Sequence, residues 1–418
     1  MKAWIVTVGE PLPTDEGSPR LLRSGALARH LVERGHEVTW FNSRFDHTHK
    51  RMRAELRQTF EHEGVKIELL AARGYKRNVS LARIRDQIAA AQDFRARASG
   101  MALPDVILCS LPTLELSAVA VDLQKATGVP VLVDIRDLWP DVYYRAVPAP
   151  MRPLLGIALQ GQERLANRTL QAAAGIVGIS PGYLDWGLRR AGRAMGPHDH
   201  MIPLGYDFKP LTASELETAT ASIAQLNIPT DRPIVWYVGT FGQQYDLAPV
   251  IKAARMFNGQ PNGPTFVLSG VGDLEARWKS MAAGLDNVVF TGWITRPEIG
   301  WLRKNAAVGL QPYAAGAPQG LANKTFEYMS AGLPIVSSLA GENGDLLKET
   351  GAGIVYNAGD ADGCYRAILE ILSSPARAQE ISRSALANYA ERFSSEAVFG
   401  SLSSALTSAA HAFRKTRQ

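Results

Sequence analysis

The chain has 418 residues, of which 46% are hydrophobic and 20% charged, and its formal net charge is +5. This length and apolar content can bury the cores of two domains of ordinary size and exclude an intrinsically disordered chain. The only two cysteines, Cys109 and Cys364, lie far apart in the sequence, which excludes a disulfide framework and is typical of a reducing compartment.

The first half of the chain alternates short apolar runs with helical patterns, which predicts a parallel sheet covered by helices over residues 1–205. Residues 4–8 predict the first strand. Ser18 can cap a helix with Pro19 at its first position, and this helix should continue to about Arg34, where Gly35 ends it. Further elements are expected as strands at 37–41, 106–109, 131–134, 176–180 and 201–204, and as a helix at about 114–127.

Residues 206–232 break this alternation and predict a linker with a lead-in helix. A second α/β set then fills residues 233–390. Its strands are expected at 234–238, 265–269, 288–291, 306–311, 334–338 and 353–356. Its helices are expected at about 247–257, 273–283, 297–304, 321–331 and 362–373, and the Ala- and Ser-rich tail from about residue 376 should also be helical.

This pattern predicts an α/β fold with two Rossmann-like, doubly wound parallel-sheet domains. Ligands of open parallel sheets bind beyond the carboxyl ends of the strands. Two such domains facing each other would therefore place the functional site in the cleft between them.

The most informative motif covers residues 319–334, which read QGLANKTFEYMSAGLP. A helix beginning near Leu321 would place Asn323, Lys324 and Glu327 on one face of its first turns. Free backbone N–H groups and the charge of Lys324 favour an anion there, and Glu327 can accept hydrogen bonds from a ribose diol. This is the layout of a nucleoside diphosphate site, although a surface helix carrying one Lys and one Glu remains an alternative.

Two glycine-containing turns follow predicted strands in the second half. In the first, Gly239, Thr240 and Gly242 can form a tight turn that approaches a phosphate closely. In the second, Gly270 could let the donor approach the backbone. Neither strand-turn-helix unit has the full dinucleotide fingerprint, which excludes a nicotinamide-dependent dehydrogenase.

The 319–334 segment resembles the nucleotide-sugar-binding segment of glycosyltransferase family 4, whose members have the GT-B fold. The resemblance implies that Glu327 hydrogen-bonds the ribose and that the backbone N–H groups of Gly320 and Leu321 meet phosphate. Gln319 stands where many members carry a glutamate that faces the donor sugar. Gln319 can still hydrogen-bond sugar hydroxyls, but it supplies no charge.

The same resemblance assigns roles to other segments of the second half. The turn at Gly239 would lie over the diphosphate, but the Arg and Lys that follow it in many relatives are missing. Lys324 would therefore neutralise the leaving group, helped by Arg136 or Arg20 from the first domain. Residues 289–294 are similar to the segment that cradles the base, so Trp293 or the backbone of Ile294 would contact it, with Trp293 as a core or rim aromatic being the alternative. Residues 393–396 resemble the point where the terminal helix, residues 391–418, crosses back to the first domain.

The first domain should supply the acceptor side. Residues 134–141 read DIRDLWPD at the end of a predicted strand, and this run resembles a branch labelled as transferring deoxy-amino sugars of the fucosamine type in O-antigen and capsule synthesis. A salt-bridged loop is the alternative for Asp134 and its neighbours. Glu163 also fits that branch, and the loop from Gly17 to Arg20 matches the family's first glycine-containing loop.

The resemblance implies a retaining hexosyltransferase that moves a sugar from a nucleotide-sugar donor, expected to be UDP-linked, to a lipid-linked or saccharide acceptor in surface polysaccharide biosynthesis. Asp137 is the one candidate for a carboxylate beneath the anomeric carbon. No Asp-x-Asp follows a strand in the second domain, so neither a divalent metal nor another cofactor is required. A nucleotide-sugar 2-epimerase and a non-catalytic nucleotide-sugar-binding protein remain the alternatives.

The positive charge is concentrated in residues 1–205, which hold 27 Lys and Arg against 21 Asp and Glu. Such a surface could meet an anionic membrane or remain an ordinary solvated face. Nucleic acid is not expected as a partner, because no recognition motif accompanies the charge. No apolar run is long enough for a signal peptide core or a membrane span, which predicts a cytoplasmic protein that could lie on the inner face of the membrane.

Overall fold

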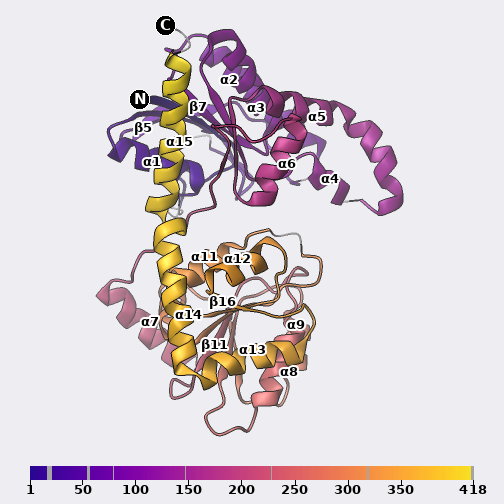
Figure 1. Ribbon diagram of the computed structural model, residues 1–418, viewed down its shortest axis with the longest axis vertical. Coiled ribbons are helices and arrows are strands. Elements are labelled where there is room, and N and C mark those ends of the chain that lie inside the picture. Colours follow the sequence, from indigo (N-terminus) through magenta and orange to yellow (C-terminus); the bar gives the residue numbers. More distant parts are fainter. Residues whose placement is uncertain are drawn as a thin grey trace. The chain divides into compact units, whose positions relative to one another are not determined.

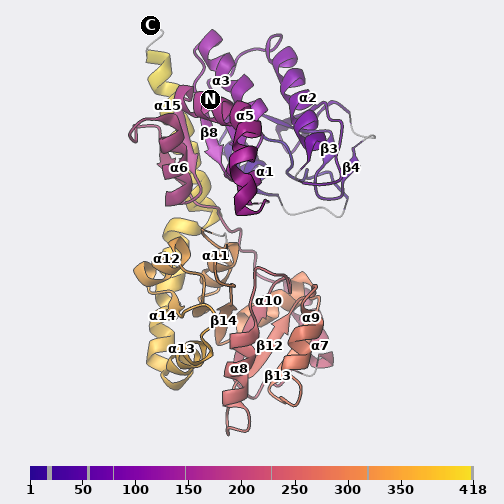
Figure 2. The same cartoon turned by 90° about the vertical axis from the view of Figure 1, so that its right-hand side faces the viewer.

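The computed structural model describes residues 1–16, 21–53, 57–78, 80–145, 147–226, 228–317 and 320–415. The chain divides into one unit formed by Met1–Leu204 with Val398–Gln418 and a second unit formed by Gly205–Ala397. Each unit is a parallel sheet with helices on both faces (Figures 1 and 2). The segment expected as a linker, residues 206–232, thus lies within the second unit and contains α7 (Ala213–Gln225).

The sheet of the first unit has the strand order β10-β9-β8-β7-β1-β2-β6-β5. All neighbouring strands are parallel except the β5–β6 pair at one edge. The strands are β1 (Lys2–Val6), β2 (Glu37–Ser43), β5 (Thr59–His62), β6 (Val65–Leu70), β7 (Val106–Leu111), β8 (Val131–Ile135), β9 (Gly175–Gly178) and β10 (His200–Met201). Because the chain builds outward from β1 on one side and then returns to add β7 on the other, the topological switch point lies between β1 and β7.

Alternate residues of the central strand face two separate cores. Trp4 packs with Phe41 and Phe94 on the face covered by α2 (Leu81–Ala98) and α3 (Leu114–Thr127). Ile5 belongs to the opposite core, which α1 (Arg23–Glu33) and the terminal helix α15 (Ser395–Lys415) cover. Burial on both faces explains why β1 is apolar from Ala3 to Val6. The rest of this unit consists of the short pair β3 (Phe45–Asp46) and β4 (Arg51–Met52), with α4 (Asp141–Arg145), η1 (Ala149–Met151), α5 (Arg152–Ala172) and α6 (Pro181–Ala191).

The second unit has a six-stranded parallel sheet of order β13-β12-β11-β14-β15-β16, the strand order of a Rossmann fold, with its switch point between β11 and β14. Its strands are β11 (Ile234–Val238), β12 (Thr265–Ser269), β13 (Val288–Gly292), β14 (Val308–Gln311), β15 (Ile335–Ser337) and β16 (Gly353–Val355). Besides α7, its helices are α8 (Ala248–Phe257), α9 (Glu275–Met281), α10 (Arg296–Asn305), α11 (Asn323–Met329), α12 (Glu342–Thr350), α13 (Ala361–Ser373) and α14 (Pro375–Asn388), followed by the π-helical turn η2 (Tyr389–Phe393).

Several expected boundaries differ in the structure. Helix α1 begins at Arg23 rather than at Ser18, which lies outside the described residues. The strand expected at 176–180 ends at Gly178, because the Ser180 side chain accepts a hydrogen bond from the Tyr183 N–H and caps α6. The strand expected at 201–204 is the short β10, since a proline at 203 has no N–H for the ladder. None of the helices in the described part of the chain is long and apolar enough to cross a bilayer.

Candidate functional site

In the second unit, the structure brings Lys324 and Glu327 together on α11. The Lys324 ammonium lies 2.7 Å from the Glu327 carboxylate, and the two side chains are 28% and 12% exposed. The helix begins at Asn323 rather than near Leu321, which instead packs partly buried against the domain core. With seven residues, α11 carries a small dipole, and Lys324 adds a full positive charge in its first turn.

A buried polar cluster fixes the start of α11. The Thr325 hydroxyl accepts a hydrogen bond from the Gln311 amide (2.9 Å) and donates one to the Asn343 carbonyl oxygen (2.6 Å). Asn343 also accepts from the backbone N–H of Ala322 and donates to Gln311. All three side chains are at most 2% exposed. The cluster therefore ties α11 to the carboxyl end of β14 and to the first turn of α12.

The turns after β11 and β12 pack backbone against backbone. The N–H of Gly239 donates to the Ser269 carbonyl (3.0 Å), and that of Phe241 donates to the Val271 carbonyl (2.9 Å). Gly270 has a φ of +149°, and a Cβ there would lie 1.8 Å from the Gly239 carbonyl oxygen. Packing against the neighbouring turn therefore requires glycine at position 270.

The remaining positions of the first turn are less constrained. The Thr240 carbonyl accepts a hydrogen bond from the Tyr237 hydroxyl (2.8 Å). A Cβ at Gly242 would meet only the Thr240 hydroxyl, at 3.6 Å, so packing does not require glycine at this position. The loops after β11 and β14 also hydrogen-bond each other, through the Asp246 N–H and the Pro312 carbonyl. These loops form the carboxyl edge of the sheet at its switch point.

Trp293 follows β13 at the same edge and is 78% exposed. The interpretation of Trp293 as a core aromatic is therefore wrong. The next residue, Ile294, is 5% exposed and belongs to the core. This placement leaves the indole ring accessible to a planar ligand while its neighbour anchors the segment.

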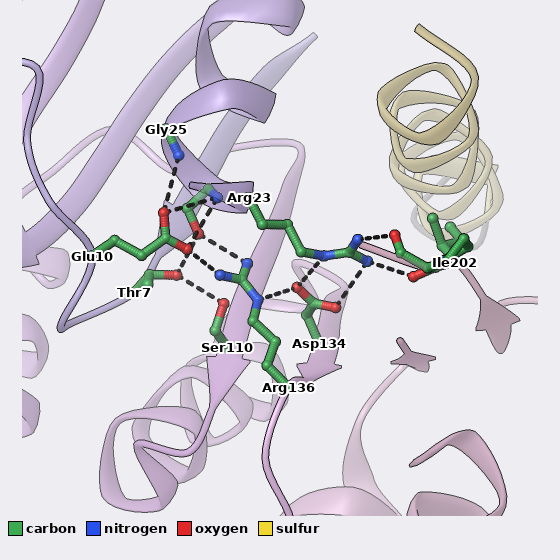
Figure 3. A network of polar contacts seen from close by, with 10 residues as sticks. Thr7, Glu10, Arg23, Gly25, Ser110, Asp134, Arg136 and Ile202 are labelled. Atoms are coloured by element: carbon green, nitrogen blue, oxygen red, sulfur yellow. Dashed lines mark hydrogen bonds and ion pairs between the residues drawn. The ribbon is translucent and has the colours of Figure 1, made fainter. Parts of the chain in front are cut away.

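In the first unit, the switch point holds a buried ionic network (Figure 3). Asp134, fully buried at the end of β8, accepts hydrogen bonds from the guanidinium groups of Arg23 (3.0 and 3.2 Å) and Arg136 (2.6 Å). Arg136 also pairs with Glu10, whose carboxylate accepts from the backbone N–H groups of Ser24 and Gly25 at the start of α1. The Thr7 hydroxyl lies 2.8 Å from that of Ser110 and bridges the ends of β1 and β7.

In this network the negative charges of Glu10 and Asp134 balance the positive charges of Arg23 and Arg136. Burial alone would raise the pKa of Asp134, but the charges of Arg23 and Arg136 outweigh it and lower that pKa. Burial would lower the pKa of Arg136, but Asp134 and Glu10 raise it. All three guanidinium nitrogens of Arg136 donate within the network. Each nitrogen of the Arg136 guanidinium thus has a partner in the network, and the side chain of Asp134 is fully buried.

Two other expected acids of the first unit are also held by neighbours. Asp137 accepts hydrogen bonds from the backbone N–H of Leu138 and from the Trp139 indole, both at 2.9 Å. Glu163 lies 2.5 Å from a guanidinium nitrogen of Arg190, which also pairs with Asp141. Within the 134–141 segment, Asp134, Arg136 and Asp141 thus form ion pairs, as the alternative of a salt-bridged loop predicts. Gly17, Arg20 and Gln319 lie outside the described residues.

No local sequence pattern marks Glu10, Arg23, Gln311, Thr325 or Asn343, because each acquires its role from a partner distant in the chain. Asp134 and Arg23, for example, are 111 positions apart. Within the described ranges, no three His, Cys, Asp or Glu side chains are grouped as metal ligands would be.

The fold and these strand-end sites define an α/β protein of the GT-B class. The model "Glycosyl transferase 4-like domain" matches residues 23–205, and the model "Glycosyl transferases group 1" matches residues 232–374. The chain is a family 4-like glycosyltransferase.

Solved structures of similar fold cover nearly the whole chain. Sucrose-phosphate synthase from Thermosynechococcus elongatus is 20% identical with a TM-score of 0.67, over 96% of this chain and 97% of that one. HepE of Anabaena in complex with UDP is 16% identical with a TM-score of 0.66, over 98% and 100%; a complex of that protein with UDP-glucose is also similar. WaaG, a glycosyltransferase involved in lipopolysaccharide biosynthesis, is 10% identical with a TM-score of 0.59, over 97% and 100%. A comparison with curated protein sequences gave no significant match.

Proposed function

We propose that this glycosyltransferase retains the donor's anomeric configuration and transfers a sugar from a UDP-linked donor to a lipid-linked or saccharide acceptor in surface polysaccharide biosynthesis. The resemblance of residues 134–141 supports a deoxy-amino sugar as the group transferred. The complexes of the Anabaena relative with UDP and UDP-glucose support a uridine nucleotide. The lipopolysaccharide role of WaaG supports a cell-surface glycan as the product. The reaction would take place at the cytoplasmic face of the membrane.

The observation that carries this proposal is the Lys324–Glu327 pair, held by a buried cluster at the carboxyl edge of the sheet. The ammonium would bind the diphosphate, and the carboxylate would accept hydrogen bonds from the ribose hydroxyls. When a donor binds, the two side chains would exchange their mutual contact for contacts with the ligand. Trp293 would stack on the base, which is consistent with its exposure.

In the proposed reaction, the bond between the anomeric carbon and the diphosphate oxygen breaks as the acceptor hydroxyl attacks from the same face. The acceptor proton passes to the departing phosphate oxygen. Lys324 stabilises the growing negative charge, a role that needs no resident metal. Asp137 is a poorer candidate for a covalent intermediate than its sequence suggested, because the Trp139 indole and the Leu138 N–H engage both its oxygens.

Steady-state kinetics of two variants test the proposal. Glu327→Ala should raise the donor KM about tenfold or more, because a buried hydrogen-bonding group is lost. Lys324→Ala should lower kcat about 10²-fold, because charge stabilisation is lost mainly in the transition state. Lys304→Ala, at an exposed position of α10, is the matched control and should retain full activity.

Product analysis separates this proposal from its rivals. With donor and acceptor together, a transferase yields free nucleoside diphosphate and a glycosylated acceptor. Conversion of the donor sugar to its 2-epimer without any acceptor would instead identify an epimerase. Full activity of both the Lys324 and Glu327 variants would show that the donor binds elsewhere.

A further inference from the structure

The amino-terminal end of α5 exposes large apolar side chains. Leu154 is 70% exposed and Ile157 is 74% exposed, and Met151, just before the helix, is 54% exposed. The buried residues of α5 all lie from Leu159 onward. Figure 1 shows this end of the helix extending away from the rest of its unit. Exposed apolar side chains gathered at one projecting end are typical of a surface that another apolar phase covers.

The exposed face of α5 changes from apolar to basic along its length. Leu154, Ile157, Gly161, Arg164 and Arg168 recur every three or four residues and so share one face. Arg164 and Arg168 are exposed. The single acid of the helix, Glu163, pairs with Arg190. The face therefore presents an apolar tip followed by positive charge.

The chain path places this tip at the carboxyl edge of the sheet of the first unit. β8 ends at Ile135, and the chain continues through α4 and η1 into α5, which leads back to the start of β9. Because β8 and β9 are parallel, α5 must begin on the carboxyl side of the sheet. Tyr144 of α4 lies against Gly156 and supports the tip from this side.

We propose that the tip of α5, defined as Met151, Leu154 and Ile157, inserts into the surface of a bilayer that contains anionic lipids. Helices with an apolar face and adjacent basic side chains bind in the interfacial plane, where the apolar residues enter the acyl boundary and the cations meet the head groups. A second copy of the chain is a poorer fit for this tip. A stable protein interface buries at least ~1,000 Å² of surface, and three side chains on a projecting helix end provide less surface than that. Binding through this tip would hold the enzyme at the membrane that carries a lipid-linked acceptor, and it does not depend on how the donor binds.

Flotation with lipid vesicles tests the proposal on the full-length chain. The wild type should bind phosphatidylcholine vesicles containing phosphatidylglycerol more tightly than vesicles of phosphatidylcholine alone. Leu154→Ser/Ile157→Ser should lower partitioning onto the anionic vesicles ~10-fold or more. Arg164→Gln/Arg168→Gln should remove the preference for anionic vesicles.

The matched control is Leu103→Ser/Met195→Ser, which removes two exposed apolar side chains that precede β7 and β10 at the opposite, amino edge of the sheet. This control should float as the wild type does. Unchanged flotation of the α5 tip variant would overturn the proposal. So would a wild-type dimer that the tip substitutions convert to a monomer in light scattering, since that result assigns the face to a second copy.

A fluorescent label gives a second readout that does not depend on removing apolar groups. Cys109 and Cys364 are both buried, so Ile157→Cys offers a selectively accessible thiol. A nitrobenzoxadiazole label at this thiol should shift to shorter wavelength when anionic vesicles are added, whereas the same label on Met195→Cys should not. An unchanged spectrum at position 157 would contradict insertion. Because neither readout uses a nucleotide-sugar, each outcome is independent of the donor-site proposal.

Discussion

Replacing Thr325 by valine tests whether the buried polar cluster positions the donor-binding helix. Valine has nearly the same shape as threonine, so the substitution leaves no cavity, but it removes the hydroxyl that hydrogen-bonds both Gln311 and Asn343. The Gln311 amide N–H then loses its partner inside the core, while Asn343 keeps its hydrogen bonds with the Ala322 N–H and with the Gln311 carbonyl oxygen. The change therefore loosens the connection between β14 and α11 without touching Lys324 or Glu327.

The expected cost follows from the hydrogen bonds that the valine cannot make. Two hydrogen bonds contribute about 0.5–1.5 kcal/mol each, and the unsatisfied amide of Gln311 adds about 1–3 kcal/mol. The free energy of unfolding of the second unit should therefore fall by about 2–6 kcal/mol, which corresponds to a decrease in Tm of roughly 4–24 °C for a domain of this size. Because misplacement of binding groups by about 1 Å can cost up to 10²-fold, kcat/KM for the donor should fall about tenfold or more.

Scanning calorimetry and donor kinetics measure these two effects. Thr265→Val is the matched control, since the Thr265 hydroxyl is buried in the same unit and makes no hydrogen bond within the described residues. It should leave both Tm and kcat/KM unchanged or raise Tm slightly. The reasoning would be refuted if Thr325→Val lost stability without any loss of donor kcat/KM, because the cluster would then support the core and not the site.

Three further predictions concern other parts of the structure. Asp134→Asn should lower the free energy of unfolding by about 3–5 kcal/mol, because two buried guanidinium groups lose their shared carboxylate. Since the pKa of Asp134 is lowered in the fold, the stability that its carboxylate contributes is present above the ordinary pKa of an aspartate and is lost as the pH falls below that value. Tm measured between about pH 7 and pH 3 should therefore fall more steeply for the wild type than for the variant. Gly270→Ala should destabilise the second unit by at least ~3 kcal/mol, whereas Gly242→Ala should melt like the wild type; equal Tm values would contradict the packing described. Trp293→Ala should leave Tm unchanged but weaken UDP binding about tenfold in titration calorimetry, as the loss of a stacking partner predicts, and unchanged UDP affinity would rule out stacking.

Local patterns determined much of the second unit. The strand expected at 234–238 and the strand at 265–269 have the same bounds in the structure, because buried parallel strands are short apolar runs with clear ends. The i,i+3 spacing of Lys324 and Glu327 was sufficient to place them in contact, since it depends on one helix only. Predictions of this kind succeed where the interaction is contained in a few consecutive residues.

Predictions about charge and exposure required the folded chain. The sequence places Arg136 at a strand end, but it does not reveal that Asp134, Glu10 and Ser24 occupy every nitrogen of its guanidinium. Likewise, the position of Trp293 after a strand is compatible with burial and with exposure. Whether a polar group is free depends on which distant groups the sheet order brings beside it.

The sequence by itself determined the alternation of strands and helices, the two-domain α/β class and the local geometry of α11, because each follows from periodicity and from spacing within one element. Only the tertiary structure decided that Gln311, Thr325 and Asn343 meet in one cluster, that Arg23 reaches Asp134, and that an apolar tip projects from α5. These features depend on strand order and chain reversal, which bring residues that are distant in sequence into contact and leave others without a covering element.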